Sequence, residues 1–122
     1  MLLLVSNNVL AEWMLIGTSA GDDLTHYVDL QSIRIDGNKV KIWYLDDFKT
    51  VKKTQNHKYL SLVGRNEFDC SDETSRLLDF YWYSKNMGAG KNVYSLSNIK
   101  DEPTAVIPRT VREVIFKIAC GK

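Results

Sequence analysis

Residues 59–84, YLSLVGRNEFDCSDETSRLLDFYWYS, predict two β-strands joined by a short polar turn at 71–74. The first strand alternates in polarity, and its apolar positions are Leu60, Leu62, Phe68 and Cys70. The second strand continues the alternation at Leu78, Phe80 and Trp82. A period of two is typical of strands that bury one face, so we expect the chain to be organised around this hairpin. Gly64 interrupts the pattern and predicts a β-bulge.

Further strands are expected on the N-terminal side of this hairpin and beyond it. Residues 32–35 and 40–48 flank Asp36-Gly37-Asn38, whose residue types accept the positive φ angles of tight turns. Residues 30–32 are ambiguous and fit a single helical turn, whereas the polar, basic residues 49–58 predict an exposed, long hairpin loop. Shorter strands are expected at 13–17, 26–29 and 93–96.

The C-terminus carries the clearest helix signal. Thr110 and Glu113 form a capping box, in which the Thr110 hydroxyl accepts from the Glu113 N–H and the Glu113 side chain reaches back to the Thr110 N–H. An apolar stripe with helical spacing follows, at Val111, Val114, Ile115, Ile118 and Ala119. Gly121 supplies a stop. The predicted fold is α+β, an antiparallel sheet of about five to six strands with this helix packed on one face.

Only two cysteines occur, Cys70 at the end of a predicted strand and Cys120 near the C-terminus. We expect them to form a disulfide that holds the helix on the sheet, which fits an oxidising compartment. The alternative is a cytosolic protein with two unrelated buried thiols, which the cysteine count alone leaves open.

The length of 122 residues suits one domain, and no apolar run approaches the roughly 20 residues of a membrane-spanning helix. Residues 1–11, MLLLVSNNVLA, predict the remnant of a truncated signal peptide, with Val9 and Ala11 at the −3 and −1 positions of a cleavage site. The alternative is an apolar N-terminal tail. No cysteine lies near this site to take a lipid anchor, so a soluble protein is expected.

The sequence offers few groups for chemistry. Asp46 and Asp47 are adjacent in a predicted strand and should point to opposite faces, and His26 and His57 lie in no metal-ligand spacing. No serine lies in a nucleophile pattern, and Gly88-Ala-Gly90-Lys91 lacks the spacing of a phosphate-binding loop. We therefore predict no catalytic, cofactor or metal site. The net charge of +1, from 16 basic and 15 acidic residues, gives no general reason to expect nucleic acid as a partner.

The basic stretch 49–58 is the candidate contact surface for a protein partner. Its lysines are Lys49, Lys52, Lys53 and Lys58. The alternative role of these lysines is to keep an exposed hairpin soluble and to blunt a sheet edge. The aromatic run at 80–83 could stack on nucleic acid, but core packing or a dimer face fits an exported domain better.

The chain resembles the surface-adhesin protein E-like family of bacterial exported proteins. The motifs that carry the resemblance run through most of the chain and include 11–13, 27–29, 32–34, 37–41, 47–49, 59–61, 67–70, 83–84, 87–90 and 107–108, with Arg76, Glu113 and Ala119-Cys120. The resemblance implies one domain over residues 12–122, a disulfide between Cys70 and Cys120, and export to the periplasm or cell surface. It also implies adhesion to host matrix and serum proteins, although the family's namesake has a lipidation cysteine that this chain lacks.

The function predicted from these observations is an exported, non-enzymatic binding protein that contacts extracellular or envelope macromolecules. Its expected location is the periplasm, the cell surface or the medium. The alternative is a periplasmic housekeeping or chaperone-like module that forms a homodimer through its edge strands.

Overall fold

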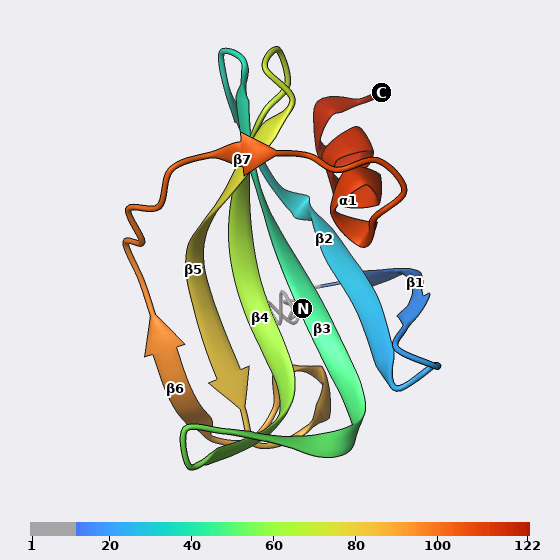
Figure 1. The fold of residues 1–122 in the computed structure, drawn as a ribbon, viewed down its shortest axis with the longest axis vertical. Coiled ribbons are helices and arrows are strands. Elements are labelled where there is room, and N and C mark those ends of the chain that lie inside the picture. The colour runs from blue at the N-terminus through green and yellow to red at the C-terminus, as the bar shows by residue number, and fades with distance from the viewer. Residues whose placement is uncertain (1–11) are drawn as a thin grey trace, which may run out of the picture.

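The computed structural model describes residues 12–122, so the predicted signal-peptide remnant lies outside the described residues. Six strands form an antiparallel meander in the order β1-β2-β3-β4-β5-β6, and a short seventh strand pairs with β5 (Figure 1). The strands are β1 (Trp13–Ser19), β2 (Leu24–Asp36), β3 (Lys39–Thr54), β4 (His57–Asp69), β5 (Thr74–Tyr83), β6 (Asn92–Leu96) and β7 (Thr104–Ala105). A 3₁₀ turn, η1 (Asn86–Gly88), precedes β6, and the helix α1 (Val111–Cys120) ends the chain.

The predicted loop at residues 49–58 is wrong, because β3 and β4 continue through it. β3 runs to Thr54, β4 begins at His57, and a two-residue turn joins them. Both turn residues, Gln55 and Asn56, have positive φ angles of 52° and 66°, as the tight turns of two-residue hairpins require. The sequence did not indicate these strands because their side chains are polar and show no apolar alternation. The main-chain hydrogen bonds that pair the strands do not depend on such alternation.

The predicted helical turn at 30–32 is also wrong. These residues belong to β2, where the pairing with β3 shifts register between Asp29 and Arg34. The Ser32 hydroxyl donates to the Asp29 carbonyl at 2.6 Å. This local hydrogen bond accompanies the irregular step of the strand, which explains the mixed signal in the sequence.

Gly64 does not mark a bulge in β4. It pairs in register with Tyr44 of β3 and Phe80 of β5, and the register shift falls between Arg65 and Asn66. The glycine is required because the Tyr44 ring lies against its backbone. A Cβ at position 64 would lie 2.5 Å from Cζ of Tyr44, far inside van der Waals contact.

Gly64→Ala is therefore expected to lower the free energy of unfolding by about 1–3 kcal/mol, the usual cost of overpacking a well-packed site. Urea denaturation measures this change. The same substitution made in a Tyr44→Ala background should cost much less, because the clashing ring is gone. Equal costs in both backgrounds would contradict the steric explanation.

The capping box of α1 forms with one changed partner. The Thr110 hydroxyl accepts from the Glu113 N–H at 3.2 Å, as predicted. The Glu113 carboxylate instead accepts from the N–H of Arg109, at 3.0 Å. Gly121 has a φ of 69° and ends the helix in the left-handed conformation, as its position predicted.

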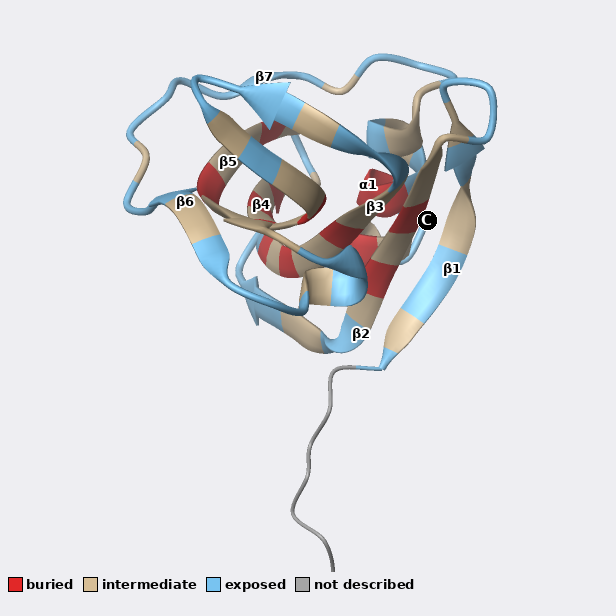
Figure 2. Ribbon diagram, turned by 90° about the horizontal axis from the view of Figure 1, so that it is seen from below, coloured by how far each residue is buried: buried red, intermediate tan, exposed pale blue. Residues whose placement is uncertain are grey.

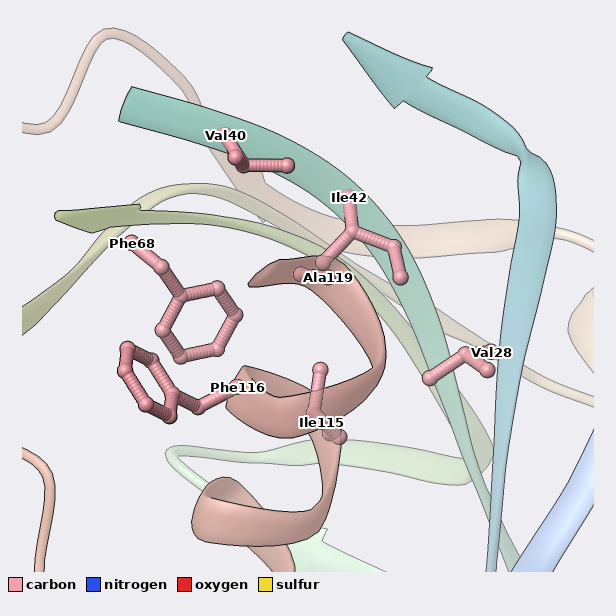
Figure 3. Packing of buried hydrophobic residues seen from close by; sticks show 7 residues of the cluster. All are labelled: Val28, Val40, Ile42, Phe68, Ile115, Phe116 and Ala119. Atoms are coloured by element: carbon pink, nitrogen blue, oxygen red, sulfur yellow. The ribbon is translucent and has the colours of Figure 1, made fainter. Parts of the chain in front are cut away.

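The core joins α1 to the middle of the sheet. One buried cluster contains Val28 of β2, Val40 and Ile42 of β3, Phe68 of β4, and the helix residues Ile115, Phe116 and Ala119 (Figure 3). The rings of Phe68 and Phe116 meet edge to face with centroids 5.7 Å apart. Buried positions lie on β2, β3, β4, β5 and α1, whereas β1, β6 and β7 contain none (Figure 2).

The disulfide predicted between Cys70 and Cys120 is confirmed. The sulfurs are 2.05 Å apart and the two cysteines are 50 residues apart in sequence. Cys70 follows the last residue of β4 and Cys120 is the last residue of α1. The bond therefore ties the C-terminal end of the helix to the end of a central strand.

Candidate functional site

Part of the sheet face that carries α1 is not covered by the helix. Tyr44 packs against the core cluster, and its ring lies over Gly64. Directly paired residues of an antiparallel sheet share a face, so Phe80, the partner of Gly64, lies on the same face as Tyr44. Trp82 follows two residues later on that face and pairs with Tyr94 of β6. None of these β5 and β6 aromatic residues belongs to the core cluster under α1.

Six rings make a connected group on this part of the sheet, which we call the aromatic cluster. Its members are Phe48, His57, Tyr59, Phe80, Trp82 and Tyr94, and each is partly exposed. Tyr59 stacks on Trp82 with centroids 4.5 Å apart, and Trp82 contacts Tyr94 at 4.9 Å. His57 lies 5.1 Å from Tyr94, and Phe48 meets Tyr59 edge to face at 5.8 Å. The rings therefore come from four strands, β3 to β6.

The β3–β4 hairpin bends to bring these rings together. Its pairing jumps from Asp47 opposite Ser61 to Lys52 opposite Tyr59, so five steps along β3 match two along β4. Extra residues on one strand bend it and increase its twist. Figure 1 shows the hairpin tip turned toward the end of β5 and the start of β6, which agrees with the contact of His57 and Tyr94.

The four predicted contact lysines lie on this hairpin in different surroundings. Lys52 is engaged, because its ammonium pairs with Asp23 at 2.6 Å and lies 5.3 Å from the Phe48 ring centroid. Hydrogen bonds from Lys52 and then from Thr50 hold the pKa of the Asp23 carboxyl below its usual value. The side chain of Lys49 is exposed, while its N–H donates to the Asp23 carbonyl at 2.8 Å. The Asp23 contacts anchor the base of the hairpin tip.

Lys53 and Lys58 are two free cations at the tip of the hairpin. They pair directly across the two strands, are exposed, and form no ion pair with any of residues 12–122. Like charges placed directly opposite destabilise a hairpin by a few tenths of a kcal/mol or more. Lys58 also borders an open hollow of about 460 Å³ between the hairpin tip and β6. The other walls of the hollow are Asn56, His57, Lys91 and Val93.

Local contacts cover part of the opposite face of the sheet. The Asp47 carboxylate accepts from the N–H of Met87 at 2.7 Å, which fixes the η1 turn against the sheet. Ser61, fully buried, donates to the Lys85 carbonyl at 2.6 Å. The buried Asp79 pairs with Arg65 at 2.6 Å. These contacts give Asp47 and Asp79 structural roles.

A hydrogen-bonded chain that the sequence did not reveal links the first three strands. The Ser19 Oγ lies 2.7 Å from the Nε2 of His26, and His26 Nδ1 lies 2.8 Å from Asp46 Oδ1. The order resembles a Ser-His-Asp triad, but a triad also needs its nucleophile beside the substrate. The cavity of about 130 Å³ that His26 and Asp46 line has no wall from Ser19. We therefore assign these hydrogen bonds a structural role: they connect β1 to β3 through His26 of β2.

The same cavity reaches the N-terminal turn of α1. Tyr44, Asn66 and Arg112 also line it. Burial raises the pKa of the Tyr44 hydroxyl above its usual value, so this group stays protonated. The Asn66 Oδ1 is buried and accepts no hydrogen bond from residues 12–122. Within those residues no group of three His, Cys, Asp or Glu side chains is placed to hold a metal ion.

The chain belongs to the surface-adhesin protein E family, whose model matches residues 13–121. Solved structures of Haemophilus influenzae protein E have the same fold. A second crystal form superposes with a TM-score of 0.66 at 14% identity and covers 98% of this chain and 94% of that one. The selenomethionine form gives 0.64 at 15% identity, with 88% and 85% covered. The protein from a non-typeable strain gives 0.58 at 15%, with 98% and 82% covered.

No curated protein sequence matches the chain significantly. Within residues 12–122, the one α-helix is too short to cross a membrane. The family assignment agrees with the resemblance found in the sequence motifs.

Proposed function

We propose that this protein is an exported, non-enzymatic adhesin-like protein that binds extracellular macromolecules. Its contact surface is the hairpin tip, with the aromatic cluster on one face and Lys53 and Lys58 on the other. The observation that carries the proposal is that six contacting rings remain partly exposed on the sheet, and that the hairpin tip which supplies His57 and Tyr59 also carries two exposed lysines that form no ion pair with any of residues 12–122.

The chemistry of this surface suits protein recognition. Aromatic side chains offer a large contact area and lose little conformational entropy on binding, which is why Tyr and Trp are enriched at interfaces. Lysines at the rim steer an acidic partner and make the association rate depend on salt. The buried region under α1 and the disulfide would keep the strands rigid, so the surface is already ordered before binding.

Two observations support the proposed location of the protein. Disulfides persist in oxidising environments such as the bacterial periplasm and the cell surface. Membership of the surface-adhesin protein E family points the same way. We therefore place the protein in the periplasm, on the cell surface or in the medium.

The test is binding to a panel of purified extracellular-matrix and serum proteins by biolayer interferometry at physiological salt. Charge reversal of Lys53→Glu with Lys58→Glu should weaken binding to the recognised protein by about tenfold, chiefly by slowing association. The matched control is Lys100→Glu with Lys117→Glu, which makes the same change in net charge elsewhere. Equal binding by both double variants, or no binding to any panel member, would refute the proposed surface.

A second candidate function, the homodimeric envelope module, rests on the free edge of β1. Among residues 12–122 this strand pairs with β2 alone, and it exposes Met14 and Leu15, with 38% and 61% of their surfaces accessible. Leu30, 45% exposed, lies on the neighbouring strand and lines an open hollow with Met14. Exposed apolar edge strands are templates for pairing with a second chain.

Sedimentation velocity over a concentration series distinguishes this second candidate. Dimerisation through β1 predicts a concentration-dependent dimer that Leu15→Lys converts to a monomer, while Ile35→Lys, an exposed site off this edge, leaves it unchanged. A monomer at all concentrations would remove this candidate and leave the adhesin-like function untouched.

A further inference from the structure

We propose that the hollow between the hairpin tip and β6 binds sulfated polysaccharide chains. The inference rests on the proposed function and names the chemical class of its partner.

The walls of the hollow supply two cations, one from β4 and one from the residue before β6. Lys58 comes from β4 and Lys91 immediately precedes β6, and both are exposed. Asn56 and His57 add side chains that can donate hydrogen bonds to anionic oxygens. No carboxylate from residues 12–122 lines the hollow. A ligand that carries fixed negative charges therefore meets attraction on both sides of the hollow.

Besides negative charge, the ligand needs a flat apolar surface, because the hollow lies beside the aromatic cluster. His57, a wall of the hollow, lies 5.1 Å from Tyr94 and 6.2 Å from Trp82. The partly exposed His57 ring is the member of the cluster that lines the hollow, and the flat C–H face of a pyranose ring can pack against such a ring. A sulfated sugar joins such a face to charged groups at its edge, so one ligand meets both requirements.

The open shape of the hollow and the low net charge of the chain favour a polysaccharide over a nucleic acid as the ligand. The hollow of about 460 Å³ is open to solvent, so a short segment of a long chain can lie in it and continue beyond it. A nucleic-acid-binding domain usually has a large excess of basic residues, whereas this chain has a net charge of +1. Two of its 16 basic residues, Lys58 and Lys91, line the hollow.

The test uses a heparin dodecasaccharide as the probe, with affinity measured by surface plasmon resonance across a NaCl series. Lys58→Gln with Lys91→Gln should weaken binding by about tenfold and reduce the slope of log K against log [NaCl], since fewer counterions are released. The matched control, Lys100→Gln with Lys117→Gln, should change affinity by less than about twofold. His57→Leu should weaken binding about threefold or more, because it removes the ring that the hollow presents to a sugar. Melting curves of each variant confirm that the fold is intact.

Three results would overturn the inference. One is an equal loss in the two double variants, which indicates unspecific attraction. Another is equally tight binding of desulfated heparin, and the third is equally tight binding of single-stranded DNA of the same length. Matrix glycoproteins stripped of their sulfated chains separate this inference from the proposed function. If stripped and intact glycoproteins bind equally and Lys53 and Lys58 still matter, the polysaccharide inference fails while the contact surface stands.

Discussion

Replacing both cysteines by serine (Cys70→Ser with Cys120→Ser) is expected to lower the free energy of unfolding by about 4 kcal/mol relative to the wild type. The melting temperature should fall by roughly 15 °C. The bond spans 50 residues, and closing a loop of this length restricts the unfolded chain strongly. The native state loses support as well, because α1 has ten residues and such helices are marginal alone in water. Freed from the bond, the helix end that carries Ala119 can leave the core more easily.

Urea denaturation of the wild type under oxidising and reducing conditions measures this effect, with the double serine variant as the reference. Strong reductant should destabilise the wild type to the level of the variant and leave the variant itself unchanged. An unchanged midpoint of the wild type, with both thiols shown to be free, would contradict the structural role given to the bond.

Phe68→Ala is expected to lower the free energy of unfolding by about 3–5 kcal/mol. The Phe68 ring is fully buried, and it is the β4 side chain against which Phe116 of the helix packs. Removing it leaves a cavity between helix and sheet that a close-packed core fills poorly. Ile35→Ala is the control, because Ile35 is 72% exposed and should change stability by less than about 0.5 kcal/mol.

The two effects should couple, since both act where α1 meets β4. In the double serine background, Phe68→Ala should cost less than in the wild type, because the helix is already held less firmly. A double-mutant cycle by urea denaturation measures the coupling. Strict additivity would indicate that the bond and the ring stabilise the protein independently, contrary to our description of the core.

Elements with strong local signals could be predicted from the sequence. The turn at Gly37 has positive φ where Asp36-Gly37-Asn38 indicated it, and α1 begins after Thr110 and ends at Gly121. The hairpin of β4 and β5 was recognised from its alternation. These features depend on neighbours in sequence, which the sequence displays directly.

Features that depend on distant partners could not be predicted. Gly64 indicated a bulge, but its reason is the ring of Tyr44, twenty residues earlier and on the neighbouring strand. The lysine-rich hairpin tip lacks an apolar period, and its pairing shows only in the main-chain register. His26 has no partner near it in sequence, because Asp46 reaches it through strand pairing.

The candidate site includes residues that the sequence indicated and contacts that it could not reveal. The sequence drew attention to Lys49, Lys52, Lys53 and Lys58, and their role as contact residues stays a prediction. It could not show that Lys52 is engaged by Asp23, because that pair joins β3 to the turn before β2. Nor could it show that Tyr59, Trp82 and Tyr94 meet, since their contact depends on the bend of the hairpin.

The central claim is that the aromatic cluster and the hairpin tip form the contact surface while α1 and the disulfide serve stability. Hydrogen–deuterium exchange of the protein, free and bound to the matrix protein it recognises, tests this claim most directly. The account predicts that binding slows exchange at residues 52–59 and 91–94 and leaves that of α1 unchanged. Protection confined to α1 or to β1, with the hairpin tip unaffected, would contradict it.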